Sequence, residues 1–571
     1  MEQGQKVEPL PALSPARRKF LPTSSLTRTG AILLGAVILH FLLFLLFVLS
    51  QQFFWLNGKP YIVLGDDAMV SMRYAWHWAH GAGPYWNGHP TPEGYTNFLW
   101  VVIMTLFHMM AGVAGISVNF VSGTVLFFNL ILAVASILLL FQMTLELTDN
   151  PTTALVCAYA LALNAQFLLW GKAGFETTLI VFLIVGANLF TLRGRLWSAS
   201  LLLSCAVLTR DDAILLVICF TLAQVAGNKR KVWINMFSVA FVPLILFVSH
   251  VIFRIHYYGT ALPNTYYLKA TSLPLAFRLN QGILYEYGMV PAFALSAWIL
   301  LRMLKTSSVA LSDSRRRTVY SALLLLLPIY FLYVLWVGGD AFSGSRLFVF
   351  SWIVPCVALA IYLTQRAPSR RGIALAGGVF LVLSLSPLNR ETASSYKYEV
   401  RCLRYALQSG LGARYAAPTA ADVQANWQMP PNARNIWQCL NIRNDAKTRS
   451  LLQPSMAVYY AGVAPYFCED FDAVDLLGKS DATIAREKPH LPGRVGHNKY
   501  DYEYSLKTFK PTYILSDVPN PESVDDIQYV RKKPGLFNFQ HLVEDEEFKK
   551  YYHNGALAGT YPVIFIRDDA H

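Results

Sequence analysis

The sequence has few charged residues, and it lacks the short motifs of the common soluble enzymes. Only 15% of its 571 residues are Asp, Glu, Lys or Arg, whereas 54% are hydrophobic and the mean hydropathy is +0.37. A typical soluble domain has about 25% charged residues, so most of this chain is not an ordinary soluble globule. The chain also contains no P-loop, no Gly-x-Gly-x-x-Gly fingerprint, no Gly-x-Ser-x-Gly motif and no Cys/His metal spacing. These absences speak against a nucleotide-dependent enzyme, an α/β-hydrolase and a zinc protein.

Cysteine is also scarce, because seven cysteines in a chain of this length do not form a disulfide scaffold. Four of them fall in apolar runs and are interpreted as small packing residues: Cys157, Cys205, Cys219 and Cys356. The other three, Cys402, Cys439 and Cys468, lie in the more polar C-terminal part. In an oxidising compartment one pair can bridge and one cysteine is left over. The sequence does not choose the pair.

Apolar runs fill most of the first 388 residues. Runs that approach the about 20 residues needed to cross a bilayer lie near 30–50, 97–116, 118–141, 152–170, 175–192, 196–209, 212–226, 233–253, 288–304, 318–338, 347–365 and 372–388. The remainder, 389–571, is polar enough to be a separate soluble domain. We therefore expect a polytopic α-helical membrane protein with a C-terminal soluble domain.

The basic residues suggest how the chain is oriented. The first run follows a basic tail, is too long for a signal peptide and has no small-residue cleavage site, so we expect a retained anchor with a cytoplasmic N-terminus. The net charge of +13 is concentrated in short loops, as the positive-inside rule predicts, and does not indicate nucleic-acid binding. These loops hold Arg193 and Arg195, Lys229 to Lys231, Lys305 with Arg315 to Arg317, and Arg366 with Arg370 and Arg371.

This orientation places the C-terminal domain outside, so the number of crossings must be odd. One of the twelve runs, within 97–170, is then re-entrant, interfacial or merged with a neighbour, and about eleven transmembrane helices are expected. The predicted organisation is a cytoplasmic tail at 1–29, a transmembrane domain at 30–388 with a first external loop at 51–96, and a periplasmic domain at 389–571. Strands predicted at 456–460, 513–516 and 563–567 and a helix at 482–488 fit a small α/β domain.

Two adjacent carboxylates, Asp66 and Asp67, begin the most informative stretch. They lie a short loop beyond the first apolar run, where an ionised group is costly unless it has a function. Further polar residues follow in the same loop: Arg73, Glu93, Tyr95 and Asn97. The alternative interpretation is that both carboxylates only cap the helix predicted to begin beside them and solvate the loop.

Further junctions on the external side also carry charged or aromatic residues. They contain Lys172 and Glu176; Arg210, Asp211 and Asp212; Asn264, Tyr266 and Lys269 in the tyrosine-rich segment 256–269; and Asp340 and Arg346 beside two glycines. Each junction has a structural alternative: a snorkelling lysine with a helix-starting glutamate, an ion pair between helices, an aromatic belt, or a tight turn. In the C-terminal part, 473–478 and 493–499 have the character of site loops. Their candidates are Lys499 and His497, although such a histidine is more often a surface residue.

Charged junctions on one face of a helical bundle, without a nucleotide-binding element, suit a donor activated by a lipid phosphate. The hydrocarbon tail would partition into the bilayer at about 0.8 kcal/mol per methylene. Arginines and lysines would hold the departing phosphate while a carboxylate takes the proton of the acceptor hydroxyl. Substrate-binding roles are therefore predicted for Arg73, Glu93, Tyr95, Asn97, Lys172, Glu176, Arg210, Asp212, Asn264, Tyr266, Lys269, Asp340, Arg346, His497 and Lys499.

Several motifs in order resemble one enzyme family. They are Asp66-Asp67-Ala68, Arg73-Tyr74-Ala75, Glu93 to Trp100, Leu208-Thr209-Arg210, Tyr257-Tyr258-Gly259, Leu262 to Tyr267, Val337 to Asp340 and Val474 to Gly478. Together they are similar to the GT-C glycosyltransferases that use polyprenyl-phosphate arabinofuranose. Among these enzymes, the motifs resemble those of the actinobacterial terminal arabinofuranosyltransferase of cell-wall arabinan and of the pseudomonad pilin arabinosyltransferase. Two positions depart from the family pattern: Phe175 where Met is expected, and Asp211 where Pro commonly follows the Arg.

The resemblance implies a GT-C fold, a catalytic acidic residue in the first external loop and a periplasmic domain that helps to bind the acceptor. The expected activity is transfer of D-arabinofuranose from polyprenyl (decaprenyl) phosphate to a pilin Ser/Thr or an arabinan end, at the outer face of the inner membrane. Asp66 is the predicted base, with Asp67 orienting it or sharing its role. The expected partners are the lipid-linked donor, the glycan or pilin acceptor and the bilayer, and no nucleic acid. No cofactor is firmly implied, and Asp66 with Asp67 is a candidate site for a divalent cation.

Three other functions stay open at this point. A flippase or transporter of lipid-linked sugars needs intramembrane polar residues along a path, and often internal repeats. A GT-C enzyme with a different polyprenyl-phosphate sugar is a second alternative. An assembly protein is the third, and in that case the Asp pair can be neutralised without loss of function. The stereochemistry is also open, because a carboxylate can be the base of one displacement or the nucleophile of two.

Overall fold

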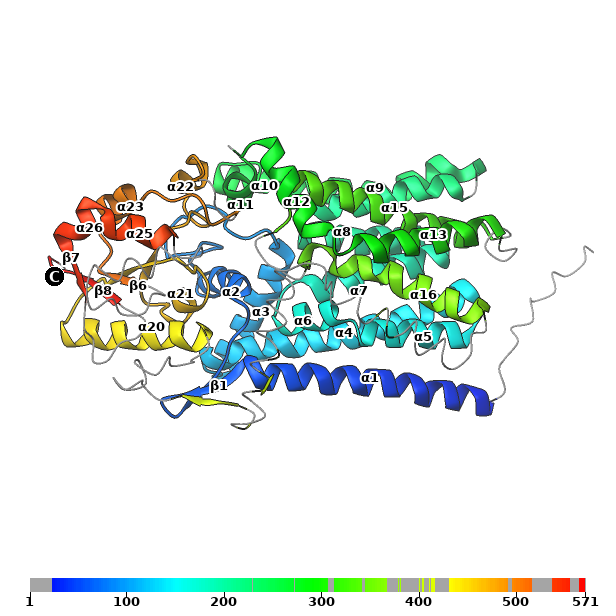
Figure 1. The fold of residues 1–571 in the computed structure, drawn as a ribbon, viewed down its shortest axis with the longest axis horizontal. Coiled ribbons are helices and arrows are strands. Elements are labelled where there is room, and N and C mark those ends of the chain that lie inside the picture. Colours follow the sequence, from blue (N-terminus) through cyan, green and yellow to red (C-terminus); the bar gives the residue numbers. More distant parts are fainter. Residues whose placement is uncertain are drawn as a thin grey trace, which may run out of the picture.

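The computed structural model is mostly helical, with a mixed α/β region at its C-terminal end (Figure 1). It describes residues 23–227, 229–271, 273–306, 313–340, 345–366, 431–490, 495–515, 537–554 and 564–569, together with 378, 380, 400, 403, 404, 410 and 412–415. The long helices lie side by side at one end of the molecule, and the C-terminal elements lie at the other end.

The helical bundle is built from the following elements. They are α1 (Thr23–Gln51), α3 (Phe98–Ala114), α4 (Val118–Thr148), α5 (Pro151–Ala162), α6 (Ala165–Lys172), α7 (Thr177–Leu192), α8 (Leu196–Thr209), η1 (Asp211–Ala213), α9 (Ile214–Ala223), η2 (Gln224–Ala226), η3 (Lys229–Lys231), α10 (Val232–Tyr258), α11 (Asn264–Ala270), α12 (Leu275–Glu286), α13 (Val290–Thr306), α15 (Ser314–Val337), η4 (Arg346–Trp352) and α16 (Ile353–Arg366).

By length and composition, five of these helices could cross a membrane, or up to seven spans result if each bent pair is one span. This is fewer than the expected number of about eleven. The predicted runs at 97–116, 175–192 and 196–209 form α3, α7 and α8, which are apolar but only 17, 16 and 14 residues long. The run at 372–388 lies almost entirely outside the described residues. The chain is thus a multi-pass membrane protein by its apolar helices.

The two bent pairs arise where the chain stops one helix and starts another. Asn164 ends the first segment of the predicted run 152–170, and its side chain accepts a hydrogen bond from Phe167 N, which caps α6. As a result α5 and α6 meet at 49°. This break lies within 97–170, the range in which we expected an interrupted or re-entrant run. The second pair, α12 and α13, bends by 73°.

Contacts among three of the predicted basic loops join neighbouring helix ends of the bundle. Figure 1 shows the ends of α13, α15 and α16 at the side away from the C-terminal elements. Arg193 pairs with Glu146 at 2.7 Å, and Arg316 pairs with Asp149 at 2.6 Å. Arg317 donates to the carbonyl of Ala226 at 3.2 Å. The loop after α7 and the start of α15 therefore both bind residues at neighbouring helix ends.

The loop predicted at 51–96 is ordered by strands and a helix. In it, β1 (Phe53–Leu56) pairs antiparallel with β2 (Lys59–Ile62) and parallel with the two-residue strand β3 (Arg414–Tyr415). Helix α2 (Asp66–Ala79) follows, as the sequence predicted. Its N-cap is Gly65, which has no side chain to make a capping bond. Both Asp66 and Asp67 lie in the first turn, where a negative charge interacts favourably with the helix dipole.

The C-terminal region is a small mixed sheet with helices around it. Its strands are β4 (Ser455–Val458), β5 (Asp472–Asp475), β6 (Tyr513–Leu515), β7 (Tyr552–Asn554) and β8 (Ile564–Arg567). The order is β5-β4-β6-β8-β7, with β5, β4 and β6 parallel and β8 antiparallel to β6 and β7. Its helices are α20 (Pro431–Thr448), α21 (Val463–Phe467), α22 (Ala482–Arg486), α23 (Tyr502–Phe509), α25 (Phe537–Glu544) and α26 (Glu546–Tyr551). The three predicted strands correspond to β4, β6 and β8, and the predicted helix corresponds to α22.

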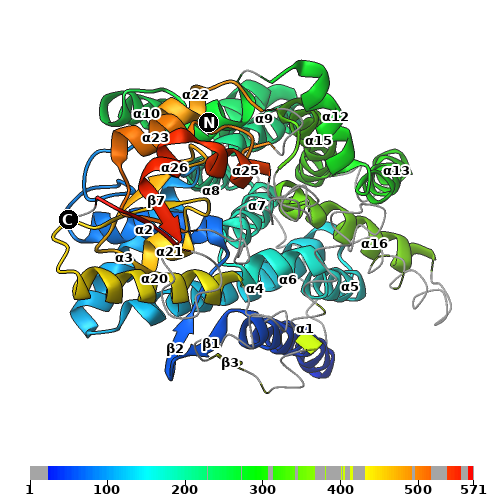
Figure 2. The same cartoon turned by 60° about the vertical axis from the view of Figure 1, so that its left-hand side comes forward.

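A disulfide joins Cys439 of α20 to Cys468, just after α21. The sequence left the pairing of the three C-terminal cysteines open, and the structure joins these two. Cys402 lies outside the described residues. Figure 2 brings this end of the molecule forward and shows α21 next to α2. The C-terminal region is therefore packed directly against the helix that carries Asp66 and Asp67.

Candidate functional site

A cavity of about 390 Å³ lies where α2, the end of α15, the start of η4, α11 and the C-terminal region meet. Five carboxylates and five cations line it: Asp67, Glu176, Asp211, Asp212 and Asp340, with Arg210, Arg254, Lys269, Arg346 and Lys479. Equal numbers of opposite charges leave the cavity with no large excess of either sign. A buried site of this kind is the default candidate for ligand binding.

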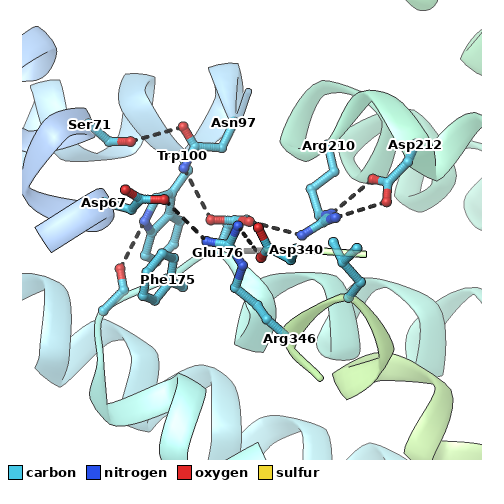
Figure 3. Close-up of polar contacts among 12 residues, drawn as sticks. Asp67, Ser71, Asn97, Trp100, Phe175, Glu176, Arg210, Asp212, Asp340 and Arg346 are labelled. Atoms are coloured by element: carbon cyan, nitrogen blue, oxygen red, sulfur yellow. Dashed lines mark hydrogen bonds and ion pairs between the residues drawn. The ribbon is translucent and has the colours of Figure 1, made fainter. Parts of the chain in front are cut away.

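Asp67, in the first turn of α2, is the one of the two adjacent carboxylates that faces the cavity. Its Oδ1 is the partner of Lys479 Nζ, and Arg346 Nη1 lies 3.9 Å from its Oδ2. Burial raises the pKa of Asp67, but the positive charges of Lys479, Arg346 and Lys269 lower it by a larger amount. The pKa of Asp67 therefore lies below its ordinary value. Asp67 is thus held as an ionised carboxylate at the cavity wall (Figure 3).

Asp66 points elsewhere, although it is the neighbouring residue. Its Oδ1 accepts a hydrogen bond of 2.9 Å from the backbone N–H of Val463, at the start of α21. Successive residues of an α-helix are about 100° apart around the axis, so two adjacent side chains diverge. The expectation that Asp66 is the base and Asp67 its helper does not fit this arrangement, because Asp66 does not line the cavity.

This divergence also bears on the candidate divalent cation. The two carboxylates have different partners, one a backbone N–H and the other two cations. In the part of the chain that the structure describes, no group of three or more His, Cys, Asp or Glu residues could hold a metal ion. The residues at Asp66 and Asp67 therefore do not fit a metal site.

Lys269, Asp340 and Arg346 form one side of the cavity. Asp340 Oδ1 accepts a hydrogen bond from Lys269 Nζ at 3.2 Å, and Asp340 Oδ2 forms an ion pair with Arg346 Nη2 at 2.7 Å. Two glycines with positive φ angles, 90° and 78°, turn the chain from α15 to Asp340. The Arg346 guanidinium also lies over the ring of Phe175, 4.9 Å from its centroid. Because Asp340 and Phe175 hold it, Arg346 is fixed between Asp67 and the rest of the cavity (Figure 3).

Glu176, Arg210 and Asp212 form a second network in the cavity wall, beside Asp340 and Arg346 (Figure 3). Arg210 is bidentate on Asp212, with Nε–Oδ1 2.9 Å and Nη2–Oδ2 2.8 Å, and its Nη1 lies 3.2 Å from Glu176 Oε1. Asn97 donates to Glu176 Oε2 at 3.1 Å and accepts from Ser71 of α2 at 3.0 Å. A chain of polar contacts therefore connects α2 to the junction of α8 and α9 (Figure 3).

A third network contains residues that the sequence did not predict. Arg254 of α10 is buried and contacts Glu93 Oε2 at 2.6 Å and Asp211 Oδ2 at 2.9 Å. Arg254 and Asp211 line the cavity, whereas Glu93 stands behind them. The available signal was an arginine at the end of an apolar run, which is costly unless paired. Lys479 was also missed, although it directly follows the motif Val474 to Gly478.

The remaining predicted residues divide into two groups. Tyr95 and Tyr266 line the cavity, and the Tyr95 hydroxyl lies 3.0 Å from that of Tyr258. Six others do not line it: Arg73, Glu93, Lys172, Asn264, His497 and Lys499. The cavity thus brings together most of the predicted residues of the bundle but neither of the two predicted from the C-terminal part.

Arg73 has a structural position between the two parts of the molecule. It is buried and donates to Trp86 O at 2.6 Å, to Phe471 O at 2.8 Å and to the carbonyl of Pro465. The guanidinium of this α2 residue therefore holds α21 and the segment after it against α2. An arginine is suited to this role because its donors form a rigid fork.

Two further predicted residues also hold the C-terminal region. Lys499 is fully buried, and its Nζ donates to Tyr267 O at 2.9 Å and Ala485 O at 2.8 Å. Burial lowers the pKa of Lys499 to about 8. Asn264 donates to three carbonyls of the segment 478–481. Lys172 is also remote from the cavity, and its partner is Gln51.

The other wall of the cavity is apolar. It is formed by Ile214, Leu215, Phe247, Val251, Leu262, Trp336, Val337 and Leu347, from α9, α10, the segment before α11, α15 and η4. Trp336 is 47% exposed on the outer surface of the bundle and Leu262 is 39% exposed. The charged cavity is therefore bordered by apolar side chains that reach the outer surface of the molecule.

Comparison with solved structures gives matches with low sequence identity and TM-scores just below 0.5. The Archaeoglobus fulgidus oligosaccharyltransferase in its apo form is 12% identical, over 86% of this chain and 69% of that chain, with a TM-score of 0.49. The same enzyme tethered to an acceptor peptide with the NVT sequon is 13% identical, over 92% and 72%, with a TM-score of 0.49. Its complex with an inhibitory peptide and a dolichol-phosphate is 12% identical, over 95% and 74%, with a TM-score of 0.48. At these values the likeness identifies neither an activity nor a substrate.

No protein-family model and no curated protein sequence matches the chain significantly.

Proposed function

We propose that this chain is a GT-C glycosyltransferase that moves a sugar from a polyprenyl phosphate to an acceptor hydroxyl at the outer face of the inner membrane. The observation that carries the proposal is the cavity, in which five carboxylates and five cations, Asp67, Lys269 and Arg346 among them, lie beside an apolar wall. Such a combination suits a ligand with a polar, phosphate-bearing head and a hydrocarbon tail. A lipid-linked sugar phosphate has both properties.

The donor would be divided between the two walls. Its isoprenoid chain would lie against Phe247, Val251 and Trp336 and continue into the bilayer, at about 0.8 kcal/mol per buried methylene. Its phosphate would bind Arg346 and Lys269, whose shared partner Asp340 keeps their charges in place. The sugar would then lie next to Asp67.

Asp67 is the proposed general base. It takes the proton of the acceptor hydroxyl while the acceptor oxygen forms a bond to C1 of the sugar. The bond between C1 and the phosphate oxygen breaks, and its electron pair leaves with the polyprenyl phosphate. Arg346 and Lys269 stabilise the charge that develops on this leaving group. A single displacement of this kind inverts the configuration at C1.

The ion pairs around Glu176 and Arg254 have a supporting role in this proposal. Buried charges are costly without partners, and here each charge has at least one within 3.2 Å. They fix α8, α9 and α10 relative to α2, and so fix the cavity around the sugar. Glu93 and Asn97, predicted from the sequence as substrate-binding, are proposed to act through these pairs.

The identity of the sugar and the acceptor rests on the resemblance of the sequence motifs. D-arabinofuranose is the proposed sugar, and a pilin Ser/Thr or an arabinan end is the proposed acceptor. The basic loops at the far end of the bundle favour a cytoplasmic position for that end. The C-terminal region would then lie in the periplasm, where it borders the cavity and can help to bind the acceptor.

The experiment uses the purified full-length protein in nanodiscs. It is given synthetic polyprenyl-phosphate arabinofuranose, or the mannose and glucose equivalents, with a pilin peptide or an arabinan oligosaccharide, and the products are weighed by mass spectrometry. We expect transfer from the arabinofuranose donor to one acceptor. Transfer from the mannose or glucose donor would show that the proposed donor sugar is wrong. Movement of the intact donor across proteoliposomes without transfer would contradict the proposal and support a flippase.

A further inference from the structure

Lys479 enters the cavity from the C-terminal region, although it was not among the predicted site residues. Its Nζ contacts Asp67 Oδ1, a residue 412 positions earlier in the chain. Among the described residues that line the cavity, it is the one that the C-terminal region supplies. Its side chain is 19% exposed, so it faces the cavity and not the outside solvent.

The loop that carries Lys479 is held from several directions. The buried carboxylate of Asp475 accepts from Leu477 N at 3.0 Å and from Ser480 N at 2.6 Å. The Asn264 amide donates to the carbonyls of Gly478 at 2.9 Å, Lys479 at 3.0 Å and Asp481 at 3.0 Å. Lys479 is therefore presented by a loop whose backbone is fixed on both sides.

Close packing adds to this fixation. Gly478 has a φ of 78°, and a Cβ there would lie 2.7 Å from Ile484 Cγ2. A Cβ on Gly94, in the first external loop, would lie 2.9 Å from the carbonyl oxygen of Lys479. The two loops therefore approach each other as closely as glycine allows. This arrangement sets the reach of the lysine into the cavity.

Charge gives a reason for a lysine at this position. Asp67 already has Arg346 at 3.9 Å, so Lys479 is a second cation beside one carboxylate. The transfer reaction converts a phosphodiester into a phosphomonoester, which carries about −1.5 to −2 charges at neutral pH. The additional negative charge appears next to Asp67, where the acceptor displaces the phosphate.

We propose that Lys479 is a ligand of the phosphate group, so that the C-terminal region completes the donor site of the bundle. This rests on the proposed function, since the phosphate is that of the lipid-linked donor and product. In the absence of lipid phosphate, Lys479 neutralises Asp67. When the lipid phosphate binds, the Lys479 ammonium pairs with the phosphate and no longer with Asp67. Asp67 loses a cation at the moment when it must accept a proton.

The test measures binding of a polyprenyl monophosphate, without a sugar, to the full-length protein in nanodiscs. Lys479→Met should weaken binding by about 10- to 100-fold, the usual range for one charge-assisted hydrogen bond. Lys479→Arg should retain most of the affinity. The control is Lys507→Met, because Lys507 is an exposed lysine of α23 that contacts Glu503 at 2.5 Å. It should bind like the wild type.

A second background separates phosphate binding from simple neutralisation of Asp67. If Lys479 only neutralises the carboxylate, Lys479→Met has no effect on binding in the Asp67→Asn variant. If Lys479 binds phosphate, the substitution still weakens binding there. The first result overturns the proposal and the second supports it. Equal affinities of wild type and Lys479→Met in both backgrounds also overturn it.

The binding assay keeps this inference separate from the transfer reaction. A wild type that binds polyprenyl phosphate through Lys479 but transfers no sugar would contradict the proposed function and support the phosphate site. If the wild type transfers sugar and Lys479→Met binds polyprenyl phosphate normally, the result supports the proposed function and contradicts the phosphate site. Thermal melting of each variant identifies any loss of affinity that comes from unfolding.

Discussion

Charge governs the behaviour of the single side chains in the cavity, and Asp67 is the clearest case. Burial pushes its pKa up, and three nearby cations, Lys479, Arg346 and Lys269, push it down by more. As a base, Asp67 must be ionised. A lowered pKa keeps it ionised throughout the neutral range, although it makes the carboxylate a weaker base until a phosphate competes for its cations.

The pH dependence of the reaction should show this charge environment. For a base with a lowered pKa, activity is full above that pKa and is lost only as the pH falls through it. We therefore expect kcat/KM, which reports the free enzyme, to have no acidic decline above about pH 4, the ordinary Asp value. Lys479→Met removes a cation, so the acidic decline should move to higher pH.

The same comparison should distinguish the free enzyme from the complex. If the phosphate draws Lys479 and Arg346 from Asp67, the acidic decline of kcat should lie at higher pH than that of kcat/KM. Lys507→Met serves again as the control and should keep the wild-type profile. A wild-type kcat/KM that declines with an apparent pKa of 6 or above would contradict the assigned base.

Among the elements, the contact between α2 and α21 positions the candidate base. Asp66 accepts from Val463 N, and Arg73 binds the carbonyls of Pro465 in α21 and of Cys468 directly after it. The backbone of Gly462 passes so close to α2 that a Cβ would overlap the carbonyl oxygen of Asp66. Because the added Cβ is bonded directly to one backbone and the oxygen belongs to the other, neither atom can move away without a shift of the backbone.

Gly462→Ala should therefore separate the two elements. We expect a loss of about 3 kcal/mol or more in stability, at or above the upper end for overpacking, together with faster proteolysis of the C-terminal region. Gly88→Ala is the matched control, since a Cβ at this exposed position meets nothing within 4 Å. Thermal melting and limited proteolysis measure both variants. Equal stability of the two would show that the α2–α21 contact is not as close as described.

For the chain as a whole, the docking of the C-terminal region on the bundle is the central feature. The disulfide between Cys439 and Cys468 closes a segment with a separation of 29 residues. Cys468 also offers its carbonyl to Arg73 at 3.4 Å. The disulfide therefore stabilises the same turn through which the C-terminal region is attached to α2.

Replacing both cysteines by serine should destabilise the C-terminal region by roughly 3 to 4 kcal/mol, on the chain-entropy estimate for a loop of this length. Sugar transfer should fall together with stability, because the region borders the cavity. Cys205→Ser is a suitable control, since Cys205 is a free cysteine of the bundle that is not fully buried. Unchanged melting of the double variant would contradict the assigned role of the disulfide.

Local patterns predicted much of this molecule, and contacts between distant segments explain most of what they missed. Hydropathy predicted a bundle of apolar helices, and the charged junctions predicted cavity residues such as Arg210 and Asp340. The contacts of Asp66 with Val463 and of Asp67 with Lys479 span 397 and 412 positions, so no local pattern could assign them. The adjacent carboxylates were grouped for the same reason, because the sequence shows their proximity but not the side of the helix each faces.

The number of spans was less predictable than the bundle itself. Apolar runs of similar composition became long helices, short helices or bent pairs, depending on single residues such as Asn164, which caps a new helix within a run. Residues such as Arg73 and Lys499 were predicted as substrate ligands because they are charged. Their carbonyl partners, which hold the C-terminal region, are not visible in composition or spacing.

The most direct test of the account compares Asp67→Asn with Asp66→Asn in the transfer assay, both purified and matched for melting temperature and for polyprenyl-phosphate binding. If Asp67 is the general base at the cavity, its substitution should lower the rate by at least about a hundredfold. Asp66→Asn, whose side chain still faces Val463, should retain most of the activity. A variant of Asp67 that transfers sugar at the wild-type rate, or a larger loss at Asp66 than at Asp67, would contradict the account.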